Sequence, residues 1–117
     1  MSLIDELKSL GVNVDEALDR VMGDQDLYVM MLGMFLSSVA ENPVGPEDFD
    51  AGDLEGLIKK IHTLKGVTGN LGLTPLFNSY TESLGLLRDG DGKAAKAVYD
   101  KLVPVQASII DCIQRYQ

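Results

Sequence analysis

The sequence predicts one all-α domain in which two short helices precede four long ones. Its 117 residues fit a single domain, and an apolar content of 45% is enough for one core of packed helices. Apolar side chains recur at steps of three and four along most of the chain, which is the spacing of helices buried on one side. Residues that cap or end helices separate these stretches.

The N-terminal part is predicted to hold the two short helices. They cover residues 3–10 and 14–22, and Gly11 separates them. Asn13 is a candidate N-cap for the second helix, because its side-chain oxygen can accept a hydrogen bond from a free N–H of the first turn. Both helices are expected to cover one end of the longer helices.

The first long helix is predicted to run from its cap, Asp24, to about Glu41, and Asn42-Pro43 ends it. Its segment 27–36 is so densely apolar that we expect burial on more than one side. The methionines in and before this segment are expected in the core, although flexible methionines could also line an adaptable partner-binding surface. They are Met22, Met30, Met31 and Met34.

Residues 44–53 hold Pro46 and two glycines and predict a loop that ends at Asp53, the cap of the next helix. Acidic side chains gather around this boundary, but they lack the ligand pattern and the loop glycine of an EF-hand. We therefore expect a solvated loop and helix start rather than a cation site. The acidic residues are Glu47, Asp48, Asp50, Asp53 and Glu55.

The second long helix carries the only histidine of the chain, His62. Positions i+3, i+4 and i+7 share a helix face, so Lys65, Gly66 and Gly69 are predicted to lie beside the imidazole. The apolar stripe falls on a different face, and His62 is therefore predicted to point away from the core. That stripe comprises Leu54, Leu57, Ile58, Ile61, Leu64, Val67 and Leu71.

Gly66 and Gly69 are costly inside a helix. An interior glycine costs about 1 kcal/mol relative to alanine, so the pair costs roughly 2 kcal/mol of a typical domain stability of about 5 to 15 kcal/mol. Two explanations are open. The glycines could clear side chains from the surface around His62, so that another molecule can approach closely, or they could permit tight helix packing.

Gly72 is predicted to end this helix, and Thr74-Pro75 to begin the third long helix, with Thr74 as its N-cap. The third helix reaches about Arg88. After a turn rich in Asp and Gly, the last helix has an apolar seam and a predicted kink at Pro104. The seam consists of Val98, Leu102, Val105, Ile109, Cys112 and Tyr116.

Composition argues against several functional classes. With 18 acidic and 10 basic residues, the net charge of −8 disfavours a nucleic-acid partner. No apolar run reaches the ~20 residues of a membrane span, and the N-terminus lacks a secretory signal, so a cytoplasmic protein is expected. The single cysteine, Cys112, is expected to be a buried, inert thiol. One histidine and one cysteine also offer few arrangements for a hydrolytic or redox enzyme.

The segment 62–72 resembles the core motif of the histidine-containing phosphotransfer (HPt) family of two-component phosphorelays. That motif is His-x-x-Lys-Gly with a further glycine ten positions after the histidine. It is matched by His62, Lys65, Gly66 and Gly72. Family-like features elsewhere extend the resemblance through most of the chain, namely 14–20, Gly23-Asp24 and 87–91.

The resemblance implies a single HPt domain over residues 1–117, folded as an antiparallel up-down four-helix bundle after the short N-terminal helices. It implies that His62 accepts a phosphoryl group from a receiver-domain aspartate and passes it to another receiver, while Lys65 stabilises the phosphoryl group. Gly66 and Gly69 would then form the surface that the partner approaches. The implied partners are response-regulator receiver domains or a hybrid histidine kinase.

On the same resemblance, the chain is a monomeric phosphoryl carrier rather than an enzyme. It needs no cofactor or metal of its own, because Mg²⁺ would belong to the receiver. Two other functions stay open. The chain could be the phosphoacceptor domain of a chemotaxis-type histidine kinase, or a helical bundle that binds receivers without transferring phosphate.

The chain departs from the family at one position. In several members a polar side chain on the following helix, often glutamine, hydrogen-bonds the second ring nitrogen of the histidine, and Leu84 matches that position here. Thr63, Ser83, a backbone carbonyl or water could take this part, or the match is shifted by one residue. The sequence therefore does not assign the attacking nitrogen.

Overall fold

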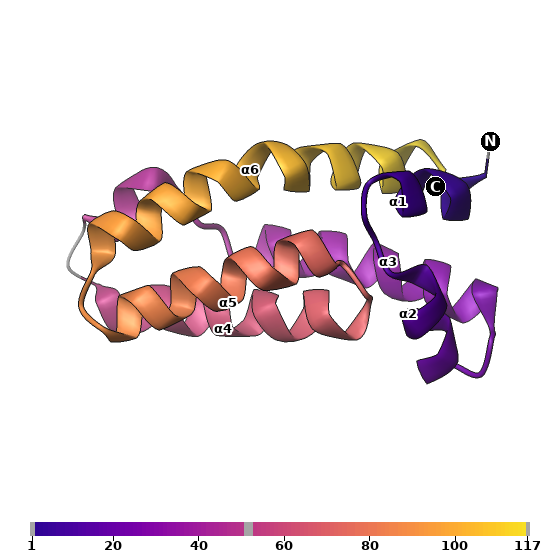
Figure 1. Ribbon diagram of the computed structural model, residues 1–117, viewed down its shortest axis with the longest axis horizontal. Helices are drawn as coiled ribbons and strands as arrows, with labels where there is room; N and C mark the ends of the chain where they lie inside the picture. The colour runs from indigo at the N-terminus through magenta and orange to yellow at the C-terminus, as the bar shows by residue number, and fades with distance from the viewer. Residues whose placement is uncertain (1, 51–52, 117) are drawn as a thin grey trace.

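The computed structural model describes residues 2–50 and 53–116, and these residues are all-α (Figure 1). The predicted helical class is therefore confirmed for this part of the chain. No helix within these ranges combines the length and the hydropathy needed to cross a bilayer. The elements are α1 (Leu3–Ser9), α2 (Val14–Arg20), α3 (Gln25–Glu41), the 3₁₀ helix η1 (Pro46–Phe49), α4 (Leu54–Asn70), α5 (Thr74–Arg88) and α6 (Gly92–Arg115).

Helices α4, α5 and α6 form the most extensively packed part of the fold. Successive helices run in opposite directions along the 42 Å length of the molecule and are joined by short turns (Figure 1). Each helix contributes an apolar stripe to a shared core, so the facing side chains are removed from water. The core includes Ile61 and Leu64 from α4, Tyr80 and Leu84 from α5, and Leu102 and Ile109 from α6.

Helix α3 packs against this core through one face only. Tyr28 and Leu32 on the inner face are fully buried, and the Tyr28 hydroxyl donates a hydrogen bond to the carbonyl of Leu71 at 2.9 Å. On the outer face, Met30 is 58% exposed and Met34 is 60% exposed. The prediction that this helix is buried on more than one side is therefore wrong, because no element of the described chain covers its outer face.

The core prediction for the methionines also needs correction. Met22 lies in the turn before α3 and is 98% exposed, and Met30 and Met34 lie on the exposed face. Met31 is half-buried and packs against the core. Helical spacing placed these residues in the core, but spacing does not show whether a second layer covers the helix.

The predicted helix starts are confirmed at three caps. The side-chain oxygen of Asn13 accepts a hydrogen bond from the N–H of Glu16 at 3.3 Å. Asp24 and Asp53 cap α3 and α4 in the same way, each at 3.1 Å from the N–H three residues later. Each cap satisfies a backbone donor that has no partner inside the helix.

Two boundary details differ from the prediction. Helix α5 begins at Thr74, so its N-cap position is Leu73, and the Thr74 hydroxyl instead donates to the carbonyl of Gly72. The predicted loop after α3 contains η1, which starts at Pro46 because proline suits the first turn of a helix. Helix α6 continues on both sides of Pro104, and the kink expected there stays a prediction.

Some residues predicted as core lie at the edge of the buried stripes. Leu54, the first residue of α4, is 45% exposed, and Val105 and Tyr116 of the predicted seam are also exposed. The buried stripe of α6 passes through Gln106 instead, one position after Val105. The Gln106 amide can be buried because the hydroxyl of Tyr80 donates to its oxygen.

Two glycines let α4 and its following turn pack closely. A Cβ atom on Gly69 would lie 2.9 Å from Cδ1 of Phe77 on α5. Gly72 has φ of +69°, and a Cβ there would lie 2.3 Å from the carbonyl oxygen of Asn13. Gly72 therefore ends α4 as predicted, because its left-handed backbone and close neighbour both exclude a side chain.

The carboxylate of Glu6 joins α1 to the end of α6. It accepts hydrogen bonds from both terminal nitrogens of Arg115 at 3.2 and 2.8 Å, from Cys112 Sγ at 3.3 Å and from the Tyr116 hydroxyl at 3.2 Å. The hydrogen bonds from Arg115 hold the pKa of Glu6 below its ordinary value of 4.5. Cys112 is buried as predicted, and burial raises its pKa to about 11.

We predict opposite effects of alanine at the two glycines of α4. Gly69→Ala should lower the free energy of unfolding by about 1 to 3 kcal/mol, because the Phe77 ring must move. Gly66→Ala is the matched control, since its new Cβ meets nothing within 4 Å, and it should raise stability by up to about 1 kcal/mol. Urea denaturation followed by circular dichroism measures both values. Equal changes in the two variants would contradict the packing role of Gly69.

We also predict a pH-dependent contribution from Glu6. Because its folded-state pKa is lowered, the charged form stabilises the fold above pH 4.5, and this stabilisation is lost as the pH falls through the lowered pKa. Glu6→Gln should therefore be less stable than the wild type at pH 7, and the difference should shrink at pH 3. Denaturation at both pH values tests this, with Glu82→Gln at an exposed position as control. A difference that does not depend on pH would refute the role of the charge.

Candidate functional site

Helix α4 holds His62 on its outward face. Leu57, Ile61 and Leu64 on the opposite face are no more than 3% exposed, and their burial fixes the rotation of the helix about its axis. His62 is exposed, so the prediction that it points away from the core is confirmed.

The imidazole of His62 has no hydrogen-bond or ion-pair partner within residues 2–50 and 53–116. None of the residues that could have hydrogen-bonded the ring does so. Ser83 is buried and its hydroxyl donates to the carbonyl of Ala95 at 3.1 Å, while Leu84 is 1% exposed in the core. The Thr63 hydroxyl donates back to the carbonyl of Lys59 at 3.0 Å. Both ring nitrogens are thus open to a visiting molecule.

Lys65 and Gly66 lie on the same side of α4 as His62. Lys65 is half-buried, and no carboxylate of the described chain pairs with its ammonium group. Gly66 is exposed, and an added Cβ would meet no atom within 4 Å, so helix packing does not explain this glycine. Helix packing does account for Gly69, whose missing side chain makes room for Phe77.

A surface depression of about 470 Å³ adjoins His62 and contains two cationic side chains that the sequence reasoning did not single out. Lys59 precedes His62 by one helical turn, so its spacing could have indicated it. Arg88 comes from the end of α5 and reaches this region only because α4 and α5 run antiparallel. The lining consists of Asp53, Glu55, Gly56, Ile58, Lys59, His62 and Arg88.

The depression is lined by two basic and two acidic side chains, and its two cations could contact an anion that reaches His62. Lys59 and Arg88 have no ion-pair partner in the described part of the chain, although the protein as a whole is acidic. Asp53 uses its carboxylate to cap α4. Among the described residues, no three His, Cys, Asp or Glu side chains converge as metal ligands. The arrangement therefore places the exposed His62 ring beside two unpaired cations and the exposed carboxylate of Glu55.

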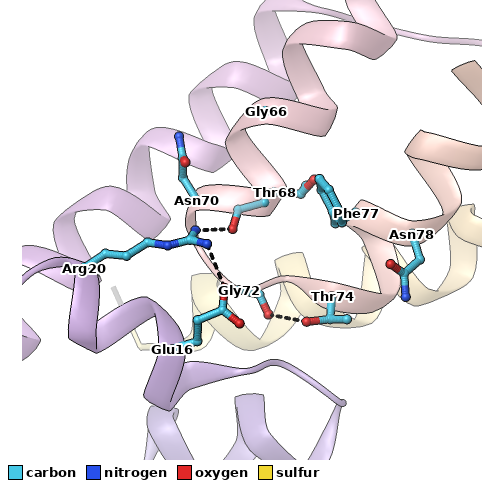
Figure 2. Close-up of a pocket in the computed structure, with 10 residues that line it drawn as sticks. Glu16, Arg20, Gly66, Thr68, Asn70, Gly72, Thr74, Phe77 and Asn78 are labelled. Atoms are coloured by element: carbon cyan, nitrogen blue, oxygen red, sulfur yellow. Dashed lines mark hydrogen bonds and ion pairs between the residues drawn. The ribbon is translucent and has the colours of Figure 1, made fainter.

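A second pocket of about 450 Å³ lies toward the C-terminal end of α4, and Figure 2 shows Arg20 of α2 reaching into it. The Arg20 Nη1 donates to the carbonyl of Gly69 at 2.5 Å, and its Nη2 pairs with Glu16 at 2.7 Å. A cation at the carbonyl end of a helix interacts favourably with the helix dipole. Arg20 therefore links α2 to α4. Gly66 also lines this pocket, so the contacts of Arg20 lie beside the open surface near His62.

No protein-family model matches the chain, and comparisons with curated proteins and with solved structures likewise found no match.

Proposed function

We propose that this chain is a phosphotransfer protein that carries a phosphoryl group on His62 between receiver domains, as its resemblance to the HPt family implies. The observation that carries the proposal is the exposed, unpartnered imidazole of His62, with Lys65 beside it and open space at Gly66. This combination suits a nucleophile that must meet a group held by another protein.

The proposed reaction is an exchange of one phosphorus bond for another. A neutral imidazole nitrogen of His62 attacks the phosphorus of an aspartyl phosphate, an N–P bond forms, and the acyl phosphate bond breaks to release the aspartate carboxylate. A second receiver reverses these steps with its own aspartate. The donor is already a reactive mixed anhydride, so this chain supplies position and charge, and Mg²⁺ belongs to the receiver.

Lys65 is proposed to stabilise the phosphoryl group. Two opposite unit charges about 4 Å apart interact by ~1 kcal/mol in water and by ~4 kcal/mol at an effective dielectric of 20. The contribution of Lys65 should therefore increase when a docked receiver excludes water. Lys65 forms no ion pair within the described residues, so its ammonium group is available for this role.

The same proposal extends to the arrangement of the helices and to the place and manner in which the protein acts. Helix α3 would be the fourth member of an antiparallel up-down four-helix bundle with α4, α5 and α6, and α1 and α2 would cover one end. The protein would act in the cytoplasm as a monomeric carrier without kinase or phosphatase activity of its own. Its partners would be receiver domains or a hybrid histidine kinase.

Replacing the histidine tests the proposal directly. A receiver domain carrying a ³²P-labelled aspartyl phosphate should transfer label to the wild type in an acid-labile form, and His62→Gln should abolish transfer. Asn70→Gln, at an exposed position on the same helix, is the control and should retain it. Equal labelling of His62→Gln would refute the assignment of His62. Receiver binding without any acid-labile label would favour an interaction module over a carrier.

Adding bulk at Gly66 tests the approach of the partner. Gly66→Leu should slow transfer from the receiver at least tenfold while leaving the circular dichroism spectrum unchanged, because the new side chain projects only into solvent. Labelling by phosphoramidate, a small donor that releases ammonia as the N–P bond to His62 forms, should stay near the wild-type rate. Unchanged transfer from the receiver would contradict the proposed approach surface.

A further inference from the structure

Helix α1 is linked to the end of α6 through the carboxylate of Glu6. Figure 1 shows α1 beside the C-terminal end of α6, in the part of the molecule where both ends of the chain lie. The Glu6 side chain is only 20% exposed, and its carboxylate accepts hydrogen bonds from three residues of that end. They are Cys112, Arg115 and Tyr116. Hydrogen bonds from a guanidinium to a carboxylate are roughly twice as strong as those between neutral groups, so this contact matters for the position of α1.

The apolar attachment of α1 rests on two leucines. Leu3 and Leu7 lie one turn apart, are 8% and 0% exposed, and belong to the core. Helix α1 has only seven residues, and a helix of that length is not stable alone in water. It therefore keeps its helical form only while it is docked. Segments with few buried apolar contacts are the ones that open at low free-energy cost while the rest of a protein stays folded.

The chain between α1 and α2 marks the boundary of such an opening. Gly11 has φ of +88°, a backbone conformation that glycine adopts readily. Two residues later, the N–H of Asn13 donates to the carbonyl of Gly72 at 2.7 Å, and Arg20 at the end of α2 donates to the carbonyl of Gly69. Helix α2 is thus hydrogen-bonded to the end of α4 without the help of α1. Gly11 lies between the part that can move and the part that is held.

We propose that α1 is a strap that opens as a unit about Gly11 while α2 to α6 stay folded, and that the hydrogen bonds to Glu6 keep it closed. The closed form predominates, because opening brings the two leucines into water. Opening also uncovers the sulfur of Cys112, since that atom lies 3.3 Å from the Glu6 carboxylate and its residue is fully buried in the closed form. The contacts of one side chain thereby set the fraction of molecules in which the end of α6 is accessible.

Labelling of the Cys112 thiol measures the opening. The native protein is treated with dithiobis(nitrobenzoic acid), a disulfide reagent, at low urea concentrations, and each rate is divided by the rate of the same thiol in the unfolded chain. The matched control is Cys112→Ala combined with Ser83→Cys, because Ser83 is fully buried and contacts Ala95 at the opposite end of α6. We expect Cys112 to be labelled at least tenfold faster than the control thiol and with a weaker dependence on urea, since a local opening exposes less surface than global unfolding.

Two variants test the part played by Glu6. Glu6→Gln keeps the size of the side chain but removes its charge, so labelling of Cys112 should become at least tenfold faster. Asp15→Asn is the control, because it breaks the ion pair between α1 and α2, in which Lys8 is 48% and Asp15 is 82% exposed. Exposed pairs contribute little to stability, and this variant should change the labelling rate less than twofold.

Amide hydrogen exchange followed by mass spectrometry separates opening from an effect on the thiol itself. The N–H groups of α1 should exchange at least tenfold faster than those of α4 and α5, and Glu6→Gln should accelerate α1 by the same factor as the labelling. Faster labelling without faster exchange of α1 would overturn the proposal, because Glu6 would then act only on the thiol. Equal rates and equal urea dependence for Cys112 and the control thiol would also overturn it, because α1 would then leave only when the whole fold unfolds.

Discussion

The one-sided burial of α4 is the constraint on which the candidate site depends. Ile61 precedes His62 directly, and both Ile61 and Leu64 are fully enclosed by the packing of α4 against its neighbours. Burial of each such side chain contributes about 1.5 to 3 kcal/mol. A rotation of the helix that hid the imidazole would expose both of them, so the core itself keeps His62 in water.

Much of this helical layout could be predicted from the sequence because its signals are local. A cap such as Asp53 acts on a backbone N–H three residues away, and the spacing of apolar residues around His62 reflects a single helix turned toward a single core. These features need no knowledge of distant elements. The exposure of His62 follows from them, which is why it could be predicted together with the helix.

The remaining features depend on residues far apart in the chain. Burial of Gln106 requires the hydroxyl of Tyr80 from another helix, and the position of Arg88 near His62 requires the antiparallel pairing of α4 and α5. The sequence also left two explanations for both glycines, an open surface or close helix packing. Only the atoms around each glycine show that packing applies to Gly69 and not to Gly66. The apolar density of α3 indicated a helix that is buried on two sides. It could not show that the described part of the chain buries only one of them.

Enclosure of Cys112 has a consequence for the reactivity of the whole chain toward electrophiles. Burial raises the pKa of this thiol to about 11, so the neutral thiol, which is not the nucleophilic form, predominates at neutral pH. Reagents that attack cysteine thiolates therefore find little to attack, while the sole imidazole of the sequence faces solvent. A histidine-selective reagent should accordingly act at one defined position, so the ring can be marked chemically without altering the sequence.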